Sequence, residues 1–229
     1  MHRRGLPGCL NATRVSDRFA LLPRLLTLLL ALVLGAAMQS HAQDVGFTLD
    51  FEEGTLRGWT KTGNAFDFQP TRGDNPTARD RGQPSRHVGN YWIGTYERFQ
   101  GGRGERPGTT QGDRPTGTLT SRAFEVPSGT LSFLIGGGQS FETRVELRIL
   151  DQIEGAIRVE MAQGRNNESM RRVQWDLTPH AGKMAHIRIV DASSEGWGHI
   201  NVDDFRFSAL NVRRMPNLIG RSIEQARRM

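Results

Sequence analysis

The sequence has 229 residues, 24% of them charged and 7% aromatic, with a formal net charge of +6. Five arginines and one aspartate in the first 42 residues contribute +4 of that charge, so the rest of the chain is nearly balanced and offers no basic surface for nucleic acid. The single cysteine, Cys9, also lies in this leader, which excludes a disulfide framework in residues 43–229.

Residues 1–42 are typical of a secretory signal peptide. Arginines precede an apolar run from Leu25 to Met38, and Ser40-His41-Ala42 forms a small-x-small cleavage pattern. The run is shorter than the roughly 20 apolar residues that a membrane-spanning helix needs. We therefore expect a secreted or periplasmic protein, which would contact a membrane only if the signal sequence stays uncleaved.

From Val45 onward, short apolar segments are separated by Gly, Pro, Asn and Asp. Val145, Leu147 and Ile149 alternate with charged residues, the pattern of a strand with one face in the core. No segment of this region has a comparable helical period. We predict an all-β fold, an antiparallel β-sandwich or jelly roll, over residues 45–208. The predicted strands are Gly46–Phe51, Tyr91–Thr95, Thr116–Phe124, Thr130–Ile135, Thr143–Leu150, Ala156–Met161, Arg171–Leu177, Met184–Val190 and Gly198–Phe207.

Two long segments, 69–87 and 100–117, flank the predicted Tyr91-Trp92 strand and are rich in Gly, Pro, Arg, Asp and Thr. Loops of this length are usually functional or disordered. We expect both to lie over one rim or face of the sandwich.

The last predicted strand, residues 198–207, changes phase. Ile200 and Val202 point one way with period two, but Phe205 and Phe207 then fall on the opposite face. One extra residue at Asp203-Asp204 would restore the phase, so we predict a β-bulge there.

Acidic residues occur in both the opening and the closing segment. Asp50, Glu52 and Glu53 lie at the end of the first predicted strand, whereas Asp203 and Asp204 lie in the last. If the two segments lie side by side, clustered carboxylates would need a cation, and oxygen ligands without Cys or paired His favour Ca²⁺. We therefore predict a structural calcium ion held by Asp50, Glu52, Asp203 and Asp204. The alternative is that these acids are solvated turn and strand-end residues.

A second set of residues combines aromatic with polar side chains. Sugars present apolar ring faces for stacking and hydroxyls for hydrogen bonds, so a sugar site needs both kinds of side chain. Trp197 lies between two glycines at an expected loop tip, whereas Trp59 and Trp175 are expected in the core. The predicted ligand-binding residues are Trp92, Tyr96, Trp197, His199 and Asn201.

The glycine run in Ile135-Gly136-Gly137-Gly138 lacks the lysine and the following helix of a phosphate-binding loop. It is more typical of a close approach, either by neighbouring backbone or by a ligand on the sheet. The sequence also lacks a nucleophile elbow and a His-Glu-x-x-His zinc motif. We expect no catalytic residues. Two carboxylates are enough for a glycosidase, however, and the many acidic residues of this sequence therefore leave glycoside hydrolysis as an alternative.

Residues 209–229 differ from the sandwich. Ser222 and Gln225 have the spacing of a helix-opening capping box, a few residues before the last residue given, Met229. We expect a linker and a short C-terminal helical fragment that begins a second, truncated domain.

Seven stretches of the sandwich resemble a known family. Together they resemble a galactose-binding-like, jelly-roll module of the kind appended to extracellular glycoside hydrolases, including some that degrade fructans. This resemblance implies a non-catalytic carbohydrate-binding module, often with a structural calcium bound by acids of its first and last strands. The stretches are DFEEGTLRGW, QPTRGDNPTAR, YWIGTYE, GTLTSRAF, LSFLIGGG, RVELRIL and EGWGHINVDDFRF.

The tail MPNLIGRSIEQARRM is similar to the opening of a PASTA repeat. Such repeats are associated with bacterial cell-envelope proteins and, in some, with peptidoglycan. The leading hypothesis is therefore an exported, non-catalytic module that binds a glycan or polysaccharide, with peptidoglycan as a partner of the truncated domain. The alternatives are a structural or interaction domain of the envelope that binds no sugar, and a fragment of a glycoside hydrolase.

Overall fold

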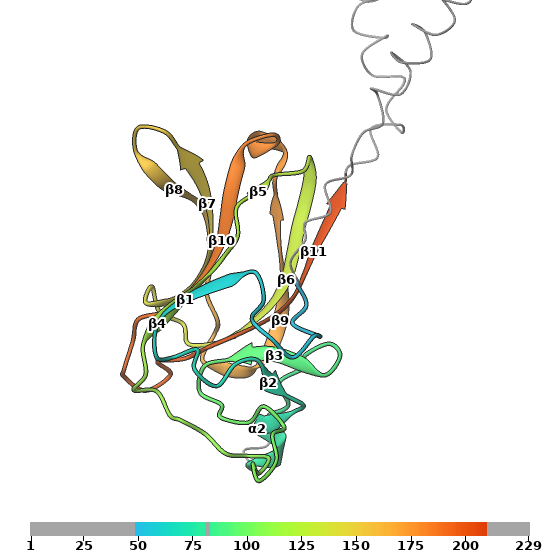
Figure 1. Cartoon of the computed structure of the whole chain (residues 1–229), viewed down its shortest axis with the longest axis vertical. Helices are drawn as coiled ribbons and strands as arrows, with labels where there is room; N and C mark the ends of the chain where they lie inside the picture. Colours follow the sequence, from blue (N-terminus) through green and yellow to red (C-terminus); the bar gives the residue numbers. More distant parts are fainter. Residues whose placement is uncertain (1–48, 81–82, 210–229) are drawn as a thin grey trace, which may run out of the picture. The chain divides into compact units, whose positions relative to one another are not determined.

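The computed structural model describes residues 49–80 and 83–209 of the chain. In these ranges the strands pair antiparallel in two sheets that face each other across an apolar core (Figure 1). The predicted all-β antiparallel sandwich is therefore confirmed. The signal peptide of residues 1–42 and the helical fragment after residue 209 lie outside the described residues and stay predictions.

The first sheet has the strand order β1-β4-β10-β7-β8, and β5 pairs with β10 beside β4. Its central strands alternate apolar and charged residues, and Val145, Leu147 and Ile187 are fully buried against the other sheet. The strands are β1 Trp59–Gly63, β4 Gly117–Ser121, β5 Phe124–Glu125, β7 Thr143–Asp151, β8 Gly155–Ala162 and β10 Met184–Asp191.

The second sheet has the order β2-β3-β11-β6-β9 and places β11 at its centre. Phe133 of β6 packs in the core against Trp175 of β9, with ring centroids 4.7 Å apart. The strands are β2 Thr71–Arg72, β3 Tyr91–Gly94, β6 Gly129–Gly137, β9 Asn167–Asp176 and β11 Ile200–Ala209. A short helix, α2 Asn75–Ala78, lies between β2 and β3, and a 3₁₀ turn, Thr178–His180, lies between β9 and β10.

Two strand predictions need correction, and two short strands were missed. Residues 49–51, the described part of the opening segment, form no strand, and the first two strands of the described residues, β1 and β2, were both missed by the sequence analysis. The predicted strand 116–124 is interrupted and forms β4 and β5. The alternation in WTKTG is weak because four of its five residues are exposed, so β1 carries little of the apolar signal that marks a half-buried strand.

The predicted bulge in β11 is confirmed. The pairing of β11 with β6 shifts register between Asp203 and Arg206, and Asp204 has a left-handed backbone with φ of 54°. Ile200, Val202 and Phe205 all lie in the core as a result. Before the bulge, His199, Asn201 and Asp203 alternate with these core residues and therefore lie on the outer side of the second sheet.

Both predicted loop segments cover this outer side. The backbone N–H of Met170 in β9 donates to Ser85 O at 2.9 Å, and the hydroxyl of Ser169 donates to Pro84 O at 2.5 Å. Asn75 of α2 contacts the second loop segment, donating to Thr109 O at 3.0 Å. These loops form the walls of the clefts described below. In the part of the chain that the structure describes, no helix has the length and apolarity needed to cross a membrane.

Candidate functional site

A cleft of about 380 Å³ opens where the two loop segments meet the start of β11. We call it the aromatic cleft because aromatic rings form much of its wall. It is lined by Arg79, Gln83, Tyr96, Asp113, Glu168, Gly196, Trp197 and His199. Its size is within the range of small-ligand sites, roughly 300 to 1,000 Å³.

Three rings are layered in the wall of this cleft. His199 stacks on Trp197 with centroids 5.4 Å apart and lies 5.0 Å from the ring of Tyr96. The guanidinium of Arg79 lies 4.8 Å from the Tyr96 centroid. Aromatic rings and cationic groups therefore alternate in one layer, an arrangement favoured by the negative faces of the rings.

Trp197 is the exposed member of this layer. Its exposed fraction is 37%, compared with 4% for His199. Its backbone has φ of 64°, a left-handed conformation that costs a bulky residue about 1 to 2 kcal/mol. A large apolar side chain held toward solvent on an unfavourable backbone is typical of a functional loop. Packing in the core does not offset the free-energy cost of this conformation.

Two glycines hold the Trp197 loop in place. A β-carbon on Gly138, next to the end of β6, would lie 2.1 Å from Trp197 O, and one on Gly198 would lie 2.5 Å from Glu195 O. Only glycine allows these approaches. Of the two roles predicted for the run Gly136–Gly138, the structure shows close approach by neighbouring backbone.

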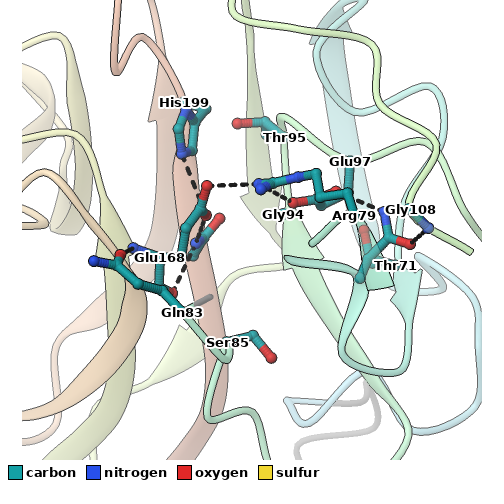
Figure 2. A network of polar contacts seen from close by, with 12 residues as sticks. Thr71, Arg79, Gln83, Ser85, Gly94, Thr95, Glu97, Gly108, Glu168 and His199 are labelled. Atoms are coloured by element: carbon teal, nitrogen blue, oxygen red, sulfur yellow. Dashed lines mark hydrogen bonds and ion pairs between the residues drawn. The ribbon is translucent and has the colours of Figure 1, made fainter. Parts of the chain in front are cut away.

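Glu168 of β9 is the centre of the polar network on the cleft floor (Figure 2). Its carboxylate lies between His199 and Arg79, accepting from Arg79 Nη2 at 2.5 Å and lying 3.6 Å from His199 Nε2. Asn201 Nδ2 donates to the same carboxylate at 3.1 Å. Burial tends to raise the pKa of Glu168, but these partners outweigh it and the pKa is lowered. Glu168 is therefore ionised at neutral pH.

His199 is held in its charged form. Its Nδ1 lies 2.6 Å from Asp113 Oδ1, on the side of the ring away from Glu168. Burial is the largest single influence and lowers the pKa of His199, yet the contacts and charges of Asp113 and Glu168 together raise it to about 9. The ring is therefore a buried imidazolium with two carboxylate partners.

Two more carboxyls support this layer from behind. Glu97 accepts from Arg79 Nη2 at 2.8 Å and from Asn75 Nδ2 at 2.6 Å, and burial raises its pKa to about 7. Burial likewise raises the pKa of Asp191 to about 7. Both are buried and neither lines the cleft, so neither is positioned to contact a ligand there.

The structure brings together three of the five predicted ligand-binding residues. Tyr96, Trp197 and His199 line the aromatic cleft. Asn201 is fully buried and orients Glu168 from beneath. The prediction that Trp92 binds a ligand needs correction, because its side chain is fully buried with Leu134 and Met170 and presents no face to a ligand. Trp92 Nε1 donates to Gly73 O at 2.8 Å, so even its polar atom is used within the fold.

The sequence analysis missed the four other lining residues that have polar side chains. Arg79, Gln83 and Asp113 belong to the two loop segments that were predicted to cover the sandwich, so their general position was available but their identity was not. Glu168 lies within a potential glycosylation motif, Asn167-Glu168-Ser169, and nothing in its neighbours signals a binding role.

The opening and closing segments lie side by side, as predicted, because Phe205 N donates to Leu49 O at 3.2 Å. Their acids, however, have separate partners. Glu52 accepts the backbone N–H groups of Asn90 and Tyr91 at 2.8–2.9 Å, whereas Asp50 is exposed.

The two acids of the bulge also face different groups. Asp203 accepts the N–H of Val88 at 2.8 Å, and burial together with the charges of Asp204 and Glu52 raises its pKa to about 8. Asp204 pairs instead with Arg172 and with Arg206, the latter at 2.8 Å.

These four carboxylates do not fit a shared calcium ion as they are arranged. Their oxygens point to backbone amides and guanidinium groups, which are donors that a calcium ligand would have to exchange for the ion. Within residues 49–80 and 83–209, no group of three or more His, Cys, Asp or Glu side chains could hold a metal ion. The calcium ion stays a prediction, and a melting temperature that EDTA leaves unchanged would contradict it.

Comparison with known proteins finds one curated relative of note. A protein of Aspergillus rugulosus named "Putative glycosyl hydrolase ecdE" is 31% identical over 153 residues, which are 66% of this chain and 19% of that protein. The chain thus spans about a fifth of the length of this relative. No family model matches the chain, so the resemblance of the tail to a PASTA repeat gains no support.

Several solved structures are similar to the chain at low identity. One is the carbohydrate-binding module TmCBM61 in complex with beta-1,4-galactotriose, with 14% identity, a TM-score of 0.43, and coverage of 71% of this chain and 95% of the module. Another is the K1 cleaved adhesin domain of Lys-gingipain from Porphyromonas gingivalis W83, with 16% identity, a TM-score of 0.40, and coverage of 71% and 96%.

Proposed function

We propose that this protein binds a glycan in the aromatic cleft and does so without catalysing its hydrolysis. The observation that carries the proposal is the exposed Trp197 ring, held on a strained backbone against a buried, charged His199. Such a ring offers an apolar platform for one face of a sugar, and the polar groups beside it suit hydroxyls.

The cleft also contains polar atoms that remain open to a ligand. Asp113 uses Oδ1 for His199, and its Oδ2 has no partner among the described residues. Gln83 accepts from Glu168 N at 3.4 Å through Oε1, which leaves its amide group as a donor. An acceptor, a donor and an apolar ring therefore surround one space, which is the combination that a sugar ring requires.

The named relative supports a role in glycan chemistry. Its name is that of a glycosyl hydrolase, and the aligned part is only 19% of that protein, so the name assigns no catalytic group to this chain. Binding modules commonly accompany such enzymes, and the resemblance described above implies the same role. Export to the periplasm or the medium, proposed from residues 1–42, would place the module where polysaccharides occur.

Affinity electrophoresis against a panel of polysaccharides tests the proposal. We expect retardation of the wild-type chain by at least one glycan, and a loss of affinity of about tenfold or more in Trp197→Ala, equivalent to about 1.4 kcal/mol. Phe141→Ala is the matched control, because Phe141 is 56% exposed but lies outside the cleft. Equal affinity of Trp197→Ala and wild type, or no retardation by any polysaccharide, would overturn the proposal.

Hydrolysis is the second candidate, favoured by the name of the relative and by the two carboxylates that line the cleft, Asp113 and Glu168. Glu168 is ionised and both flank an imidazolium, so the cleft offers charge pairing rather than a protonated carboxyl acid. Release of reducing sugar by the isolated chain, abolished in Asp113→Asn, would establish hydrolysis instead of binding alone.

A further inference from the structure

A second cleft of about 420 Å³ lies beside the aromatic cleft on the outer side of the second sheet. Three arginines line it: Arg86 from the loop after α2, Arg165 from the turn before β9, and Arg171 from β9 itself. We call it the arginine cleft. A third hollow of about 330 Å³ is also lined by Arg165 and Arg171, so these two side chains stand between two depressions of the surface.

The positive charges of this cleft lack negative partners. Neither Arg86, Arg165 nor Arg171 forms an ion pair with any residue that the structure describes, and no Asp or Glu lines the cleft there. Arg171 donates to the backbone O of Gln163 at 3.2 Å, while its Nε is buried without a hydrogen-bond partner. Other arginines of the outer surfaces, such as Arg144 and Arg148, are paired with Glu146.

The lack of a partner affects the energetics of the cleft. Burial lowers the pKa of Arg171, and the nearby charge of Arg165 lowers it further. Like charges held together without a counter-ion repel each other, and an anion placed between them would remove this cost. Guanidinium groups bind the oxygens of carboxylates and of tetrahedral oxyanions such as phosphate and sulfate through paired N–H donors, so the cleft suits an anionic group of this kind.

The two clefts share a wall. Gln83 lines both, and the β9 strand supplies Glu168 to the aromatic cleft and its neighbours Asn167 and Ser169 to the arginine cleft. A ligand longer than one sugar ring that occupies the aromatic cleft can therefore extend past Gln83 to the arginines. Nucleic acid is a poor alternative ligand, because the near-balanced charge of residues 43–229 provides no extended basic surface.

We propose that the arginine cleft binds the carboxylate or sulfate group of an acidic glycan whose neighbouring ring occupies the aromatic cleft. This inference rests on the proposed function and adds the class of glycan to it. The aromatic cleft supplies stacking, and the arginine cleft selects chains that carry a negative charge.

Paired polysaccharides that differ only in charge test the inference. Polygalacturonate is compared with its methyl-esterified form, and dextran sulfate is compared with dextran, each by affinity electrophoresis with the wild-type chain. We expect binding of polygalacturonate, dextran sulfate or both, weakened in 0.5 M salt, and at most weak binding of the uncharged form, because screening reduces charge attraction. The two arms distinguish carboxylate from sulfate as the bound group.

The cleft variant is a double substitution, Arg165→Gln with Arg171→Gln. We expect it to bind the acidic polysaccharide about tenfold or more weakly than wild type and to melt near the wild-type temperature. Arg57→Gln is the matched control, because Arg57 is an exposed arginine, 74% accessible, paired with Glu53 away from both clefts. Trp197→Ala is expected to weaken the same binding, since one chain would occupy both clefts.

The outcomes separate this inference from the proposed function. Binding of neutral but not of acidic polysaccharides would overturn the inference and leave the proposed function intact. An equal loss in Arg57→Gln and in the cleft variant would also overturn it, because the attraction would then be unspecific. No retardation by any polysaccharide would overturn both.

Discussion

The aromatic and arginine clefts share Gln83 and a stretch of β9. They differ in whether their cationic side chains have carboxylate partners. In the aromatic cleft, Arg79 and His199 are cationic groups with buried carboxylate partners, and Glu168 pairs with both. In the arginine cleft the guanidinium groups have no such partners within the described ranges. Paired charges fix the shape of a site, whereas unpaired charges are available to a ligand.

The largest test of this contrast is the removal of the central carboxylate. Glu168→Gln leaves Arg79 and His199 without their shared partner, and breaking a buried ion pair costs about 3 to 5 kcal/mol. Urea unfolding should show this loss of stability. Glu53→Gln, which breaks the exposed pair with Arg57, should cost less than about 1 kcal/mol. If both variants unfold alike, the network around Glu168 does not stabilise the fold.

The pH dependence of stability should show the charge on His199. Its pKa is raised from 6.5 to about 9 in the folded chain, so its contribution is fully present below pH 6.5 and is lost as the pH rises through 9. The contribution is on the order of 3 kcal/mol. Asp113 and Glu168 contact the ring, and Glu97 and Asp191 interact with its charge without contacting it.

The variant His199→Gln isolates this contribution from other titrating groups, including Asp203, whose raised pKa acts in the same direction. The difference in stability between wild type and variant should shrink between pH 6.5 and 9, measured by thermal unfolding. A constant difference across this window would show that His199 is neutral in the folded chain.

The smallest expected effect, and one of opposite sign, belongs to the arginine cleft. Arg165→Gln removes a charge that repels Arg171 and breaks no ion pair among the described residues, so stability should stay within about 0.5 kcal/mol of wild type or increase slightly. Urea unfolding under the conditions used for Glu168→Gln gives the comparison. A loss of more than about 1 kcal/mol, which exceeds the usual effect of a surface substitution, would mean that Arg165 has a structural role.

Periodicity predicted most of the fold. The strands β6, β7, β9, β10 and β11 carry alternating apolar residues, and the phase change in β11 even located the bulge at Asp203-Asp204. The strand predicted over residues 46–51 is wrong for its described part, residues 49–51, because apolar alternation does not distinguish a paired strand from a segment that only packs, as Phe51 does against Phe205.

The site was predicted less completely than the fold. Trp197 and His199 were found because flanking glycines and a polar face of a strand are local signals. Arg79, Asp113 and Glu168 come from three distant segments, and their meeting depends on loop paths that no local pattern encodes. Trp92 shows the reverse error, since its tryptophan ring looks like a ligand platform in the sequence but fills a small outer core under the loop.

The close contact of Gly138 with the main chain of Trp197 fixes the position of the tryptophan loop in the free protein. The tryptophan loop lies directly on the sheet end, without side chains between them that could rearrange. The loop therefore loses its conformational entropy when the protein folds and not when a ligand binds. Under the proposed function, a glycan that matches the preset ring would pay little beyond the entropy cost of its own immobilisation, so a short oligosaccharide would suffice for binding.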